Sequence, residues 1–446
     1  MVAADPSTTE YGKTEYDLRV DAETILQAAV AAVDPEALVE AAMHGHERSI
    51  PANGRVWVAG FGKAVIPMAQ GLYRSLGDRI EGGVLIAPIG TQAYIAPQFE
   101  IFRGGCPLPD QGGVAGAQAI RQMAREASED DLLICLVSGG GSALLTLPPD
   151  DLPIEDVQVV TDLLQRAGAG ISEINCVRRH MDMLKGGRLA REAAPARVLS
   201  LTLSNIVGDS PDVVASGPVS PDPTRFTDAV GVLKRYDLWK QVPLAARGWL
   251  DQGVCGEIED TPDKNDPMFL RTTHVVVGSA ETAARAACTE ADRLGYDAQV
   301  LTTTLGGEAS EAGSFLAETA RVVRAAQVPG RRPTCIVTAG TTSVRRQGDG
   351  HGGRNQELAL GAAIEIDRMD GVLVASMSTD GIDGSTDAAG ATATGSTLRR
   401  ATDSGVDCAM AKASNDAYSV FGALDDLIIS GPTGTNVADI QVVLLN

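Results

Sequence analysis

The sequence predicts an α/β protein built from two domains. Short runs of β-branched and aliphatic residues alternate with alanine-rich helical stretches, a pattern typical of parallel sheets covered by helices on both faces. The length of 446 residues is enough for two or three domains. Hydrophobic residues make up 44% of the chain and aromatic residues only 4%, which suits cores of Val, Leu and Ala between helices and sheets.

The individual elements follow from these runs. Strands are predicted at 56–59, 83–87, 132–137, 198–203, 274–277, 298–302, 334–338, 372–377 and 440–444. Helices are predicted at 21–32, 64–76, 116–127, 157–167, 280–294, 308–326 and 356–366. The polar stretch 256–271 lacks periodicity and is interpreted as a linker between an N-terminal domain, 21–255, and a C-terminal domain, 272–446. Residues 1–20 are expected to form a tail.

Composition limits the classes of binding partner and the cellular compartment that we expect. The net charge of −21 argues against a nucleic-acid partner, which demands a basic face. No apolar run reaches the roughly 20 residues that cross a membrane, and the polar N-terminus lacks the features of a signal peptide, so we expect a cytoplasmic protein without a membrane partner. Strong acidity with few lysines favours a salt-adapted, halophilic cytoplasm, with an ordinary acidic enzyme as the alternative. The sequence leaves the oligomeric state open, with a homodimer as one option.

Cysteine usage predicts reduced thiols. The seven cysteines are scattered singly, without a CxxC pair, and several lie in apolar runs. The five histidines show no metal-ligand spacing. A disulfide framework and a zinc site are therefore not expected.

Two glycine-rich loops follow predicted strands of the N-terminal domain. Strand 56–59 leads into Gly60, Phe61, Gly62 and Lys63, and strand 132–137 leads into a second loop, whose residues are Ser138, Gly139, Gly140, Gly141 and Ser142. Ligands of α/β sheets bind outside the carboxyl ends of the strands, and glycines let backbone N–H groups approach an anion. A tight turn with a solvated lysine is the alternative for the first loop. Neither loop matches the P-loop or the G-x-G-x-x-G dinucleotide fingerprint.

A basic cluster and an aspartate follow farther along the same domain. Arg178, Lys185 and Arg188 are spaced to share a helix face, which would suit an oligophosphate or a carboxylate; a solvated basic face is the alternative. Asp209 follows strand 198–203, where it could hold a metal ion or a hydroxyl group, or act as a turn residue.

The C-terminal domain carries a glycine loop and an acidic loop. Four glycines between 348 and 353 end at Arg354 and Asn355, where a helix begins, so the guanidinium and free N–H groups are expected to bind phosphate or carboxylate. A flexible surface hairpin is the alternative. Strand 372–377 opens into Asp380, Asp383 and Asp387, which could bind Mg²⁺ or supply a base for a substrate hydroxyl, unless they form only an acidic turn.

These loops together predict a phosphoryl-transfer site. Cationic groups would stabilise the moving phosphoryl group, while acidic residues would hold Mg²⁺ and orient the nucleophile. Because the loops come from both halves of the chain, we expect the site in a cleft between two domains that closes on its substrates.

The motifs resemble the glycerate 2-kinases of the MOFRL type (glycerate kinase class II). The matching segments occur in the family's order and span the chain from about residue 20; they are 60–64, 138–144, 175–180, 185–189, 207–209, 215–218, 352–357, 379–390, 415–418 and 431–436. The resemblance implies a large N-terminal Rossmann-like three-layer domain and a smaller C-terminal α/β domain. It implies phosphorylation of D-glycerate at its 2-hydroxyl, with ATP and Mg²⁺, to give 2-phosphoglycerate and ADP.

The resemblance also implies roles for individual residues. Lys63 and Arg354 match the family's proposed active-site lysine and arginine, and the loop with Asp380 matches its acidic loop. The remaining expected ligand-binding residues are Gly60, Gly62, Ser138, Gly139, Gly140, Gly141, Ser142, Arg178, Lys185, Arg188 and Asn355. Asp209, Asp383 and Asp387 are expected to bind the metal ion.

Three positions depart from the family's usual pattern. Thr341 stands where an acidic residue is usual, Cys106 where a histidine is usual and Asn205 where an aspartate is usual. Glu308, Asp209 or the acidic loop could compensate. The alternative functions are a hydroxypyruvate reductase, for which no nicotinamide fingerprint is visible, and a non-catalytic protein that binds a sugar acid or a nucleotide.

Overall fold

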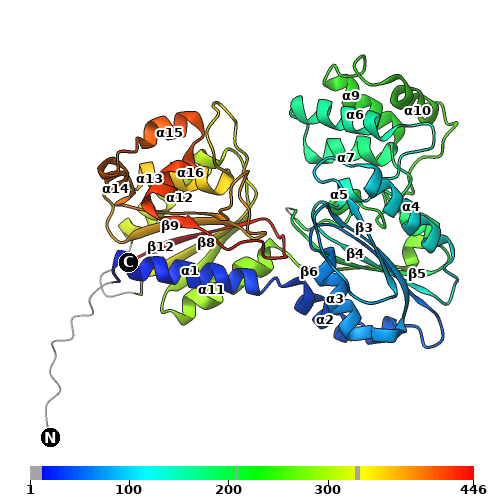
Figure 1. The fold of residues 1–446 in the computed structure, drawn as a ribbon, viewed down its shortest axis with the longest axis horizontal. Helices are drawn as coiled ribbons and strands as arrows, with labels where there is room; N and C mark the ends of the chain where they lie inside the picture. Colours follow the sequence, from blue (N-terminus) through cyan, green and yellow to red (C-terminus); the bar gives the residue numbers. More distant parts are fainter. Residues whose placement is uncertain (1–12, 207, 327–331) are drawn as a thin grey trace, which may run out of the picture. The chain divides into compact units, whose positions relative to one another are not determined.

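The computed structural model describes residues 13–206, 208–326 and 332–446 of the chain. They fall into two compact units, each with its own sheet (Figure 1). The large unit comprises Asp34–Ser279 and Gly434–Val437, and the small unit comprises Met1–Val33, Ala280–Thr433 and Ala438–Asn446. The predicted α/β class is confirmed in both.

The sheet of the large unit has a Rossmann-like strand order. Its strands are β1 (Val56–Phe61), β2 (Ile80–Pro88), β3 (Phe99–Gly104), β4 (Leu132–Val137), β5 (Arg197–Leu203) and β6 (Thr272–Gly278). They are all parallel and lie in the order β3-β2-β1-β4-β5-β6. The chain direction along the sheet reverses between β1 and β4, and ligands bind at such a switch point. Phe61 pairs with Val137 there, so the loops after both strands start side by side.

Helices cover this sheet and form a separate group beyond it. Helices α2 (Pro35–Gly45) and α3 (Val65–Leu76) pack together against the strands, as do α4 (Gln111–Arg125) and α8 (Arg188–Ala193). The separate group, with a core that includes Leu164, Phe226 and Leu233, consists of α6 (Ile154–Arg166), α7 (Ile171–His180), α9 (Phe226–Arg235) and α10 (Leu244–Val254) (Figure 1). The short helix α5 (Gly141–Leu144) follows β4.

The small unit contains a mixed sheet between two helix layers. Its strands are β7 (Asp297–Leu305), β8 (Thr334–Gly340), β9 (Val372–Ser378), β10 (Gly390–Thr394), β11 (Leu427–Ile428) and β12 (Asp439–Leu445), in the order β11-β10-β9-β12-β8-β7. Strand β12 runs antiparallel to β8 and β9, β10 runs antiparallel to β9, and β11 runs antiparallel to β10. The prediction of parallel sheets is therefore wrong here, because alternation of strands and helices does not fix the direction of a terminal strand that enters the sheet centre.

Helices pack on the strands of the small unit in two groups. Helices α1 (Glu15–Ala31) and α11 (Ala280–Arg293) contact each other and the strands, and so do α12 (Ala309–Ala326) and α13 (Arg354–Glu365). Three short helices pack on one another beside α13: α14 (Thr397–Asp403), α15 (Cys408–Ser414) and α16 (Ala417–Leu424). A capping box fixes the start of α1, since the Thr14 side chain accepts from the Asp17 backbone and the Asp17 side chain from the Thr14 backbone.

The predicted domain boundaries differ from these units. Residues 13–20 of the expected tail include the start of α1, which packs in the small unit; residues 1–12 lie outside the described residues. The expected linker 256–271 packs in the large unit, where Asp260 accepts a hydrogen bond from the Phe226 backbone. Strand β6, expected to open the C-terminal domain, pairs with β5 instead. Apolar periodicity identifies a strand but not the sheet that it joins.

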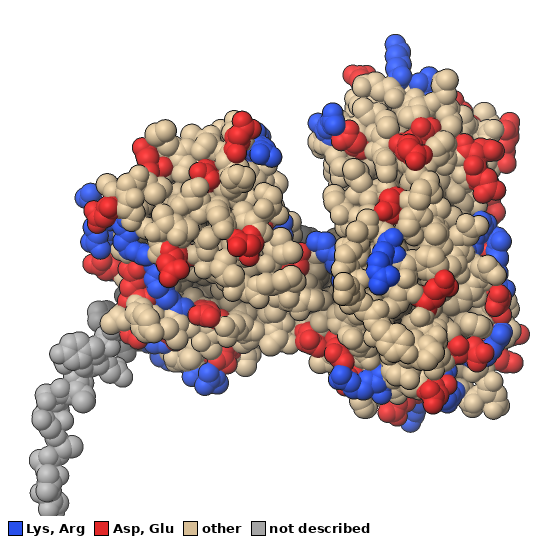
Figure 2. All heavy atoms as spheres, viewed as in Figure 1, with Lys and Arg blue, Asp and Glu red and all other residues tan. Residues whose placement is uncertain are grey.

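Surface charge and helix length agree with the composition. Acidic and basic side chains are interspersed over the face of the described residues seen in Figure 2, without a large basic patch on that face. No described helix has the length and apolar character needed to cross a membrane. The seven cysteines are free thiols, of which four are buried, while Cys106 and Cys288 are half-buried and Cys255 is exposed.

Candidate active site

The two glycine loops of the large unit are tied together at the switch point. The Lys63 backbone donates to the Gly139 carbonyl at 2.8 Å, and the Ala64 backbone donates to the Ser138 hydroxyl at 3.1 Å. Gly62 has a φ of +131°, and a Cβ there would lie 2.1 Å from the Ser138 Oγ. Only glycine fits this close approach. Gly60 differs, because it lies inside β1, where a Cβ would clash with Leu85 and Val65. Its role is packing, in place of the ligand contact that was expected.

The second glycine loop is flanked by two of the three positions that depart from the family pattern. A Cβ on Gly140 would lie 3.2 Å from the Cys106 sulfur and 3.3 Å from the Lys63 Cγ. A Cβ on Gly139 would lie 2.5 Å from the Asn205 amide nitrogen. Sequence reasoning named Cys106 and Asn205 only as departures, whereas the structure places both against the loop.

Arg178 brings a second positive charge to this place. Its guanidinium is half-buried, and burial lowers its pKa, while the neighbouring Cys106 thiol acts in the opposite direction. Among the residues that the structure describes, no side chain or backbone group forms a hydrogen bond or ion pair with the Arg178 guanidinium. Removing a cation from water without a partner is unfavourable, so Arg178 is suited to an anionic ligand. The prediction that Arg178 binds such a ligand stays a prediction with geometric support.

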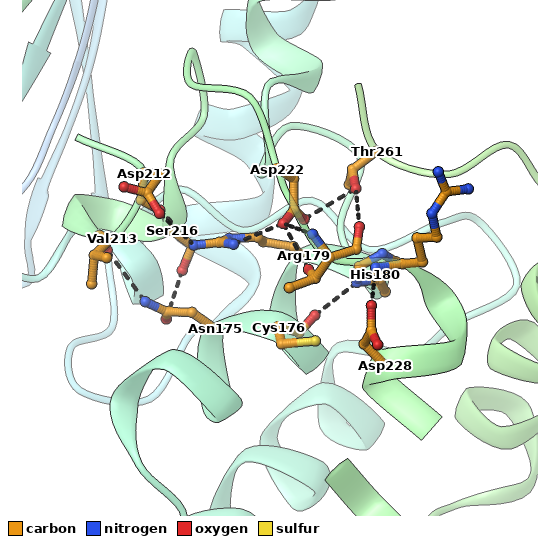
Figure 3. Close-up of polar contacts among 12 residues, drawn as sticks. Asn175, Cys176, Arg179, His180, Asp212, Val213, Ser216, Asp222, Asp228 and Thr261 are labelled. Carbon is orange, nitrogen blue, oxygen red and sulfur yellow. Dashed lines mark hydrogen bonds and ion pairs between the residues drawn. The ribbon is translucent and has the colours of Figure 1, made fainter. Parts of the chain in front are cut away.

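The next residue, Arg179, has a structural role (Figure 3). Its guanidinium pairs with Asp222 at 2.8 Å and donates to the Asp212 carbonyl at 2.6 Å, and both members of the ion pair are buried. Thr261 donates to the other carboxylate oxygen of Asp222. This network joins α7 to the segment that was expected to be a linker.

Lys185 and Arg188 are also held by the protein itself. The buried ammonium group of Lys185 donates to Asp182 at 2.6 Å, to the Thr146 hydroxyl at 3.1 Å and to the Leu145 carbonyl. These contacts use its three hydrogens. Arg188 donates to the carbonyls of Arg179 and Asp182 at 2.7 Å each. These contacts, which stabilise the turn between α7 and α8, favour a structural role for both residues over the predicted ligand-binding role.

The predicted anion site at the start of α13 contains a carboxylate of the chain. Asp383 is fully buried and accepts hydrogen bonds from the backbone N–H groups of Asn355 and Gln356 and from both of their amide side chains, at 3.0–3.2 Å. A Cβ on Gly353 would lie 2.3 Å from the Asp383 Cγ. The glycine loop therefore serves an internal helix cap. These contacts favour a structural role for Asn355 and Asp383 over the predicted roles in substrate and metal binding.

Arg354 forms a two-point ion pair with Asp439. Its Nε lies 2.5 Å from the Asp439 Oδ2 and its Nη2 lies 2.6 Å from Oδ1, while Nη2 also donates to the Ser378 hydroxyl at 3.3 Å. Burial alone would lower the Arg354 pKa, but the hydrogen bonds and charge of Asp439, with Asp383 and Asp380 nearby, raise it above the usual range. Among the described residues, Nη1 has no hydrogen-bond partner. A ligand would therefore meet Arg354 through Nη1.

The other carboxylates do not gather into a preformed metal cage. Within the described ranges, no group of three or more His, Cys, Asp or Glu residues could hold a metal ion. Asp387 accepts from the Tyr418 hydroxyl at 2.8 Å, and Asp380 accepts from the Ser378 hydroxyl at 2.7 Å. The Asp209 carboxylate has no hydrogen bond or ion pair with a described residue, and its φ of +50° marks a strained turn. Mg²⁺ commonly uses one or two carboxylates plus substrate phosphates, and Asp209 fits that donor set.

Comparison with known proteins identifies both parts of the chain. Residues 21–251 match the family described as a domain of unknown function (DUF4147), and residues 334–439 match the MOFRL family. Glycerate 2-kinase of Pyrococcus horikoshii is 36% identical over 88% of this chain and 88% of its own length. D-glycerate 2-kinase of Thermotoga maritima is 36% identical over 88% of this chain and 91% of its own.

A third relative carries another name, and a solved structure shares the fold. A putative hydroxypyruvate reductase of Agrobacterium vitis is 35% identical over 94% of this chain and 93% of its own length. The crystal structure of a glycerate kinase from Thermotoga maritima superimposes with a TM-score of 0.87 at 34% identity, covering 97% of this chain and 100% of that chain. The chain therefore belongs to the glycerate kinase family whose members combine a DUF4147 domain with a MOFRL domain.

Proposed function

We propose that the protein phosphorylates D-glycerate at its 2-hydroxyl with ATP and Mg²⁺, giving 2-phosphoglycerate and ADP. The observation that carries the proposal is the half-buried Arg178, without an ionic partner among the described residues, beside the glycine loops at the switch point. Both substrates are anions, and phosphoryl transfer relies on fixed positive charge. Membership of the glycerate kinase family supports the same reaction.

The roles of the residues follow from charge and position. In the large unit, Lys63 and the N–H groups of Gly139 and Gly140 would hold phosphate oxygens, and Arg178 would hold an anionic group of the same ligands. In the small unit, Arg354 would contact a ligand anion through Nη1, and Asp380 would accept the proton of the attacking hydroxyl. Arg354 and Asp380 stay in this assignment because the family resemblance places them in its active-site motifs.

Asp209 is the proposed protein ligand of the magnesium ion. When bound, Mg²⁺ would neutralise charge that develops on the transferring phosphoryl group. Asp209 would share the ion with phosphate oxygens, as is usual for magnesium sites with a single protein carboxylate.

Product analysis tests the reaction. Purified protein with ATP, Mg²⁺ and D-glycerate should release ADP, and phosphorus NMR of the product should show 2-phosphoglycerate. The assay should extend from low to multimolar salt, because the acidic composition suggests salt adaptation. Failure to form any phosphoglycerate across that range would refute the proposal, and 3-phosphoglycerate would correct the position of transfer.

A hydroxypyruvate reductase is the second candidate, favoured by the name of the Agrobacterium vitis relative. The large-unit sheet has the Rossmann order, but the loop after β1 does not carry the G-x-G-x-x-G fingerprint of dinucleotide sites. Oxidation of NADH or NADPH in the presence of hydroxypyruvate, without ATP, would establish this function instead.

A further inference from the structure

A relay of hydrogen bonds connects α7 to the second glycine loop. The Asn175 side-chain nitrogen donates to the Val213 carbonyl at 3.2 Å, and its side-chain oxygen accepts from the Ser216 hydroxyl at 2.9 Å (Figure 3). The Ser216 and Ser142 hydroxyl oxygens lie 3.0 Å apart. Asn175 and Ser216 are fully buried, whereas Ser142 is half-buried.

The direction of each bond in this relay is determined. The Val213 carbonyl can only accept, so it must face the NH₂ group of Asn175, and the Asn175 oxygen must then face Ser216. Ser216 has one hydroxyl hydrogen and donates it to Asn175. The bond between the two serines therefore uses the Ser142 hydrogen, and Ser142 is the donor toward the protein interior.

This direction limits what Ser142 can offer a ligand. With its hydrogen committed to Ser216, the Ser142 oxygen presents only lone pairs to the site. It repels the acceptor oxygens of phosphate and carboxylate, and attracts a ligand hydroxyl or a metal ion. Lys63 and Arg178 both lie near Gly140 and Cys106, and two positive charges there disfavour a metal ion at the same loop.

The chemistry of a hydroxy acid fits these neighbours. Arg178 lies three residues after Asn175 on α7, so the two side chains share a helix face. An anionic group held by Arg178 would then lie beside the group that Ser142 recognises. We propose that Ser142 accepts a hydrogen bond from the substrate hydroxyl that is not phosphorylated, because the attacking hydroxyl gives its single hydrogen to Asp380, and that Asn175 and Ser216 are positioning residues that fix this polarity. The inference rests on the proposed function and identifies Ser142 as the residue that binds the substrate hydroxyl.

Calorimetric binding without turnover tests the assignment. The ligands are D-glycerate, D-lactate without the 3-hydroxyl, 3-hydroxypropanoate without the 2-hydroxyl, and propanoate, each with and without Mg²⁺ and a non-hydrolysable ATP analogue. Ser142→Ala should weaken D-glycerate about five- to tenfold, as expected for one hydrogen bond. It should leave propanoate and D-lactate, which both lack the 3-hydroxyl, unchanged, and should weaken 3-hydroxypropanoate. Ser172→Ala, an exposed serine on α7, is the matched control and should bind all ligands like the wild type.

Ser216→Ala tests whether the direction of the Ser142 hydrogen bond matters, and not only whether the Ser142 hydroxyl is present. This variant keeps Ser142 but frees its hydrogen, so the preference for D-glycerate over propanoate should fall while propanoate binding is retained. Equal weakening of propanoate and D-glycerate by Ser142→Ala, weakening of inorganic phosphate, or an effect seen only with Mg²⁺ would each overturn the inference. If the wild type binds D-glycerate and Ser142→Ala binds it with the same affinity, the inference alone is refuted. If the wild type neither binds nor phosphorylates D-glycerate, the proposed function is refuted.

Discussion

Arg354 and Asp439 lie 85 residues apart in the sequence and form a two-point ion pair, with contacts of 2.5 and 2.6 Å. Asp439 is the first residue of β12 and is fully buried, whereas the Arg354 side chain keeps 30% of its surface exposed. The pair therefore fixes the guanidinium and leaves Nη1 without a hydrogen-bond partner among the described residues. Arg354 acts from a fixed position.

Loss of this anchor should affect stability and activity together. Asp439→Ala would leave the partly exposed Arg354 without its charge partner and should lower the free energy of unfolding by about 1.5–3 kcal/mol, as is usual for hydrogen bonds to a charged group. Arg354→Lys keeps the charge but not the two-point contact, so kcat/KM should fall with a smaller loss of stability. Thermal unfolding and steady-state kinetics measure both. Normal kinetics for Arg354→Lys would remove Arg354 from the proposed catalytic residues.

Substitution of Arg178 should mainly lower activity, whereas substitution of the adjacent Arg179 should mainly lower stability. Arg178→Ala breaks no ion pair with a described residue, so stability should change little, while kcat/KM should fall by about 10²–10³ if its charge holds an anion. Arg178→Lys should recover part of the activity. Arg179→Ala leaves Asp222 buried and unpaired and should lower the free energy of unfolding by about 3–5 kcal/mol. A destabilised Arg178→Ala with normal kinetics would contradict the assignment.

Lys63 and Lys185 form a second contrasting pair. Lys63 is exposed beside the glycine loop, so Lys63→Ala should keep the fold and reduce kcat/KM by about 10²–10³. Lys185→Ala should mainly lower the melting temperature, because Asp182 would lose its buried partner. Kinetics of Lys185→Ala are measured well below its melting temperature. A selective loss of kcat there would restore Lys185 to the ligand-binding set.

The sequence predicts nine of the twelve strands in the described residues and misses β3, β10 and β11. Strands β4 and β9 are buried at every position, and their sequences are apolar except for Ser376 and Ser378 in β9. Strand β3 lies at the sheet edge and carries Glu100 and Arg103, so its pattern is broken. Strand β10 consists of Gly, Ala and Thr, and it lies in a stretch of small residues without the large apolar side chains that would indicate a strand.

The part of the site that has a local sequence signal could be predicted. Glycine loops after strands carry a local signal, and the structure brings those after β1 and β4 together. Whether a charged residue faces a ligand or an internal partner depends on contacts distant in sequence, such as that of Arg354 with Asp439. Asn175 and Ser216, 41 residues apart, were missed for the same reason.

Glu357 should make stability depend on pH near neutrality. It lies in α13, 3% exposed, and burial raises its pKa to about 7; Glu308 and Asp383 act in the same direction, while Asn415 and Lys412 oppose it. The unfolded carboxyl, with an ordinary pKa near 4.5, releases its proton at lower pH than the folded one. The folded state thus binds more protons between these values, and stability should fall as pH rises from about 4.5 to 7.

Replacement by an uncharged isostere isolates this effect. Glu357→Gln should raise the free energy of unfolding above pH 7 by on the order of 2–3 kcal/mol, and should have little effect near pH 4.5, where the wild-type carboxyl is protonated in the folded state. Denaturant unfolding at a series of pH values measures the difference. Glu311→Gln, which alters an exposed carboxylate of α12, is the control and should show no such pH-dependent gain. An equal stability change for Glu357→Gln at pH 4.5 and pH 8 would mean that the Glu357 pKa is the same in the folded and unfolded states. A larger loss of stability at pH 8 than at pH 4.5 would mean that Glu357 is stabilised as a carboxylate, and that Lys412 and Asn415 outweigh its burial.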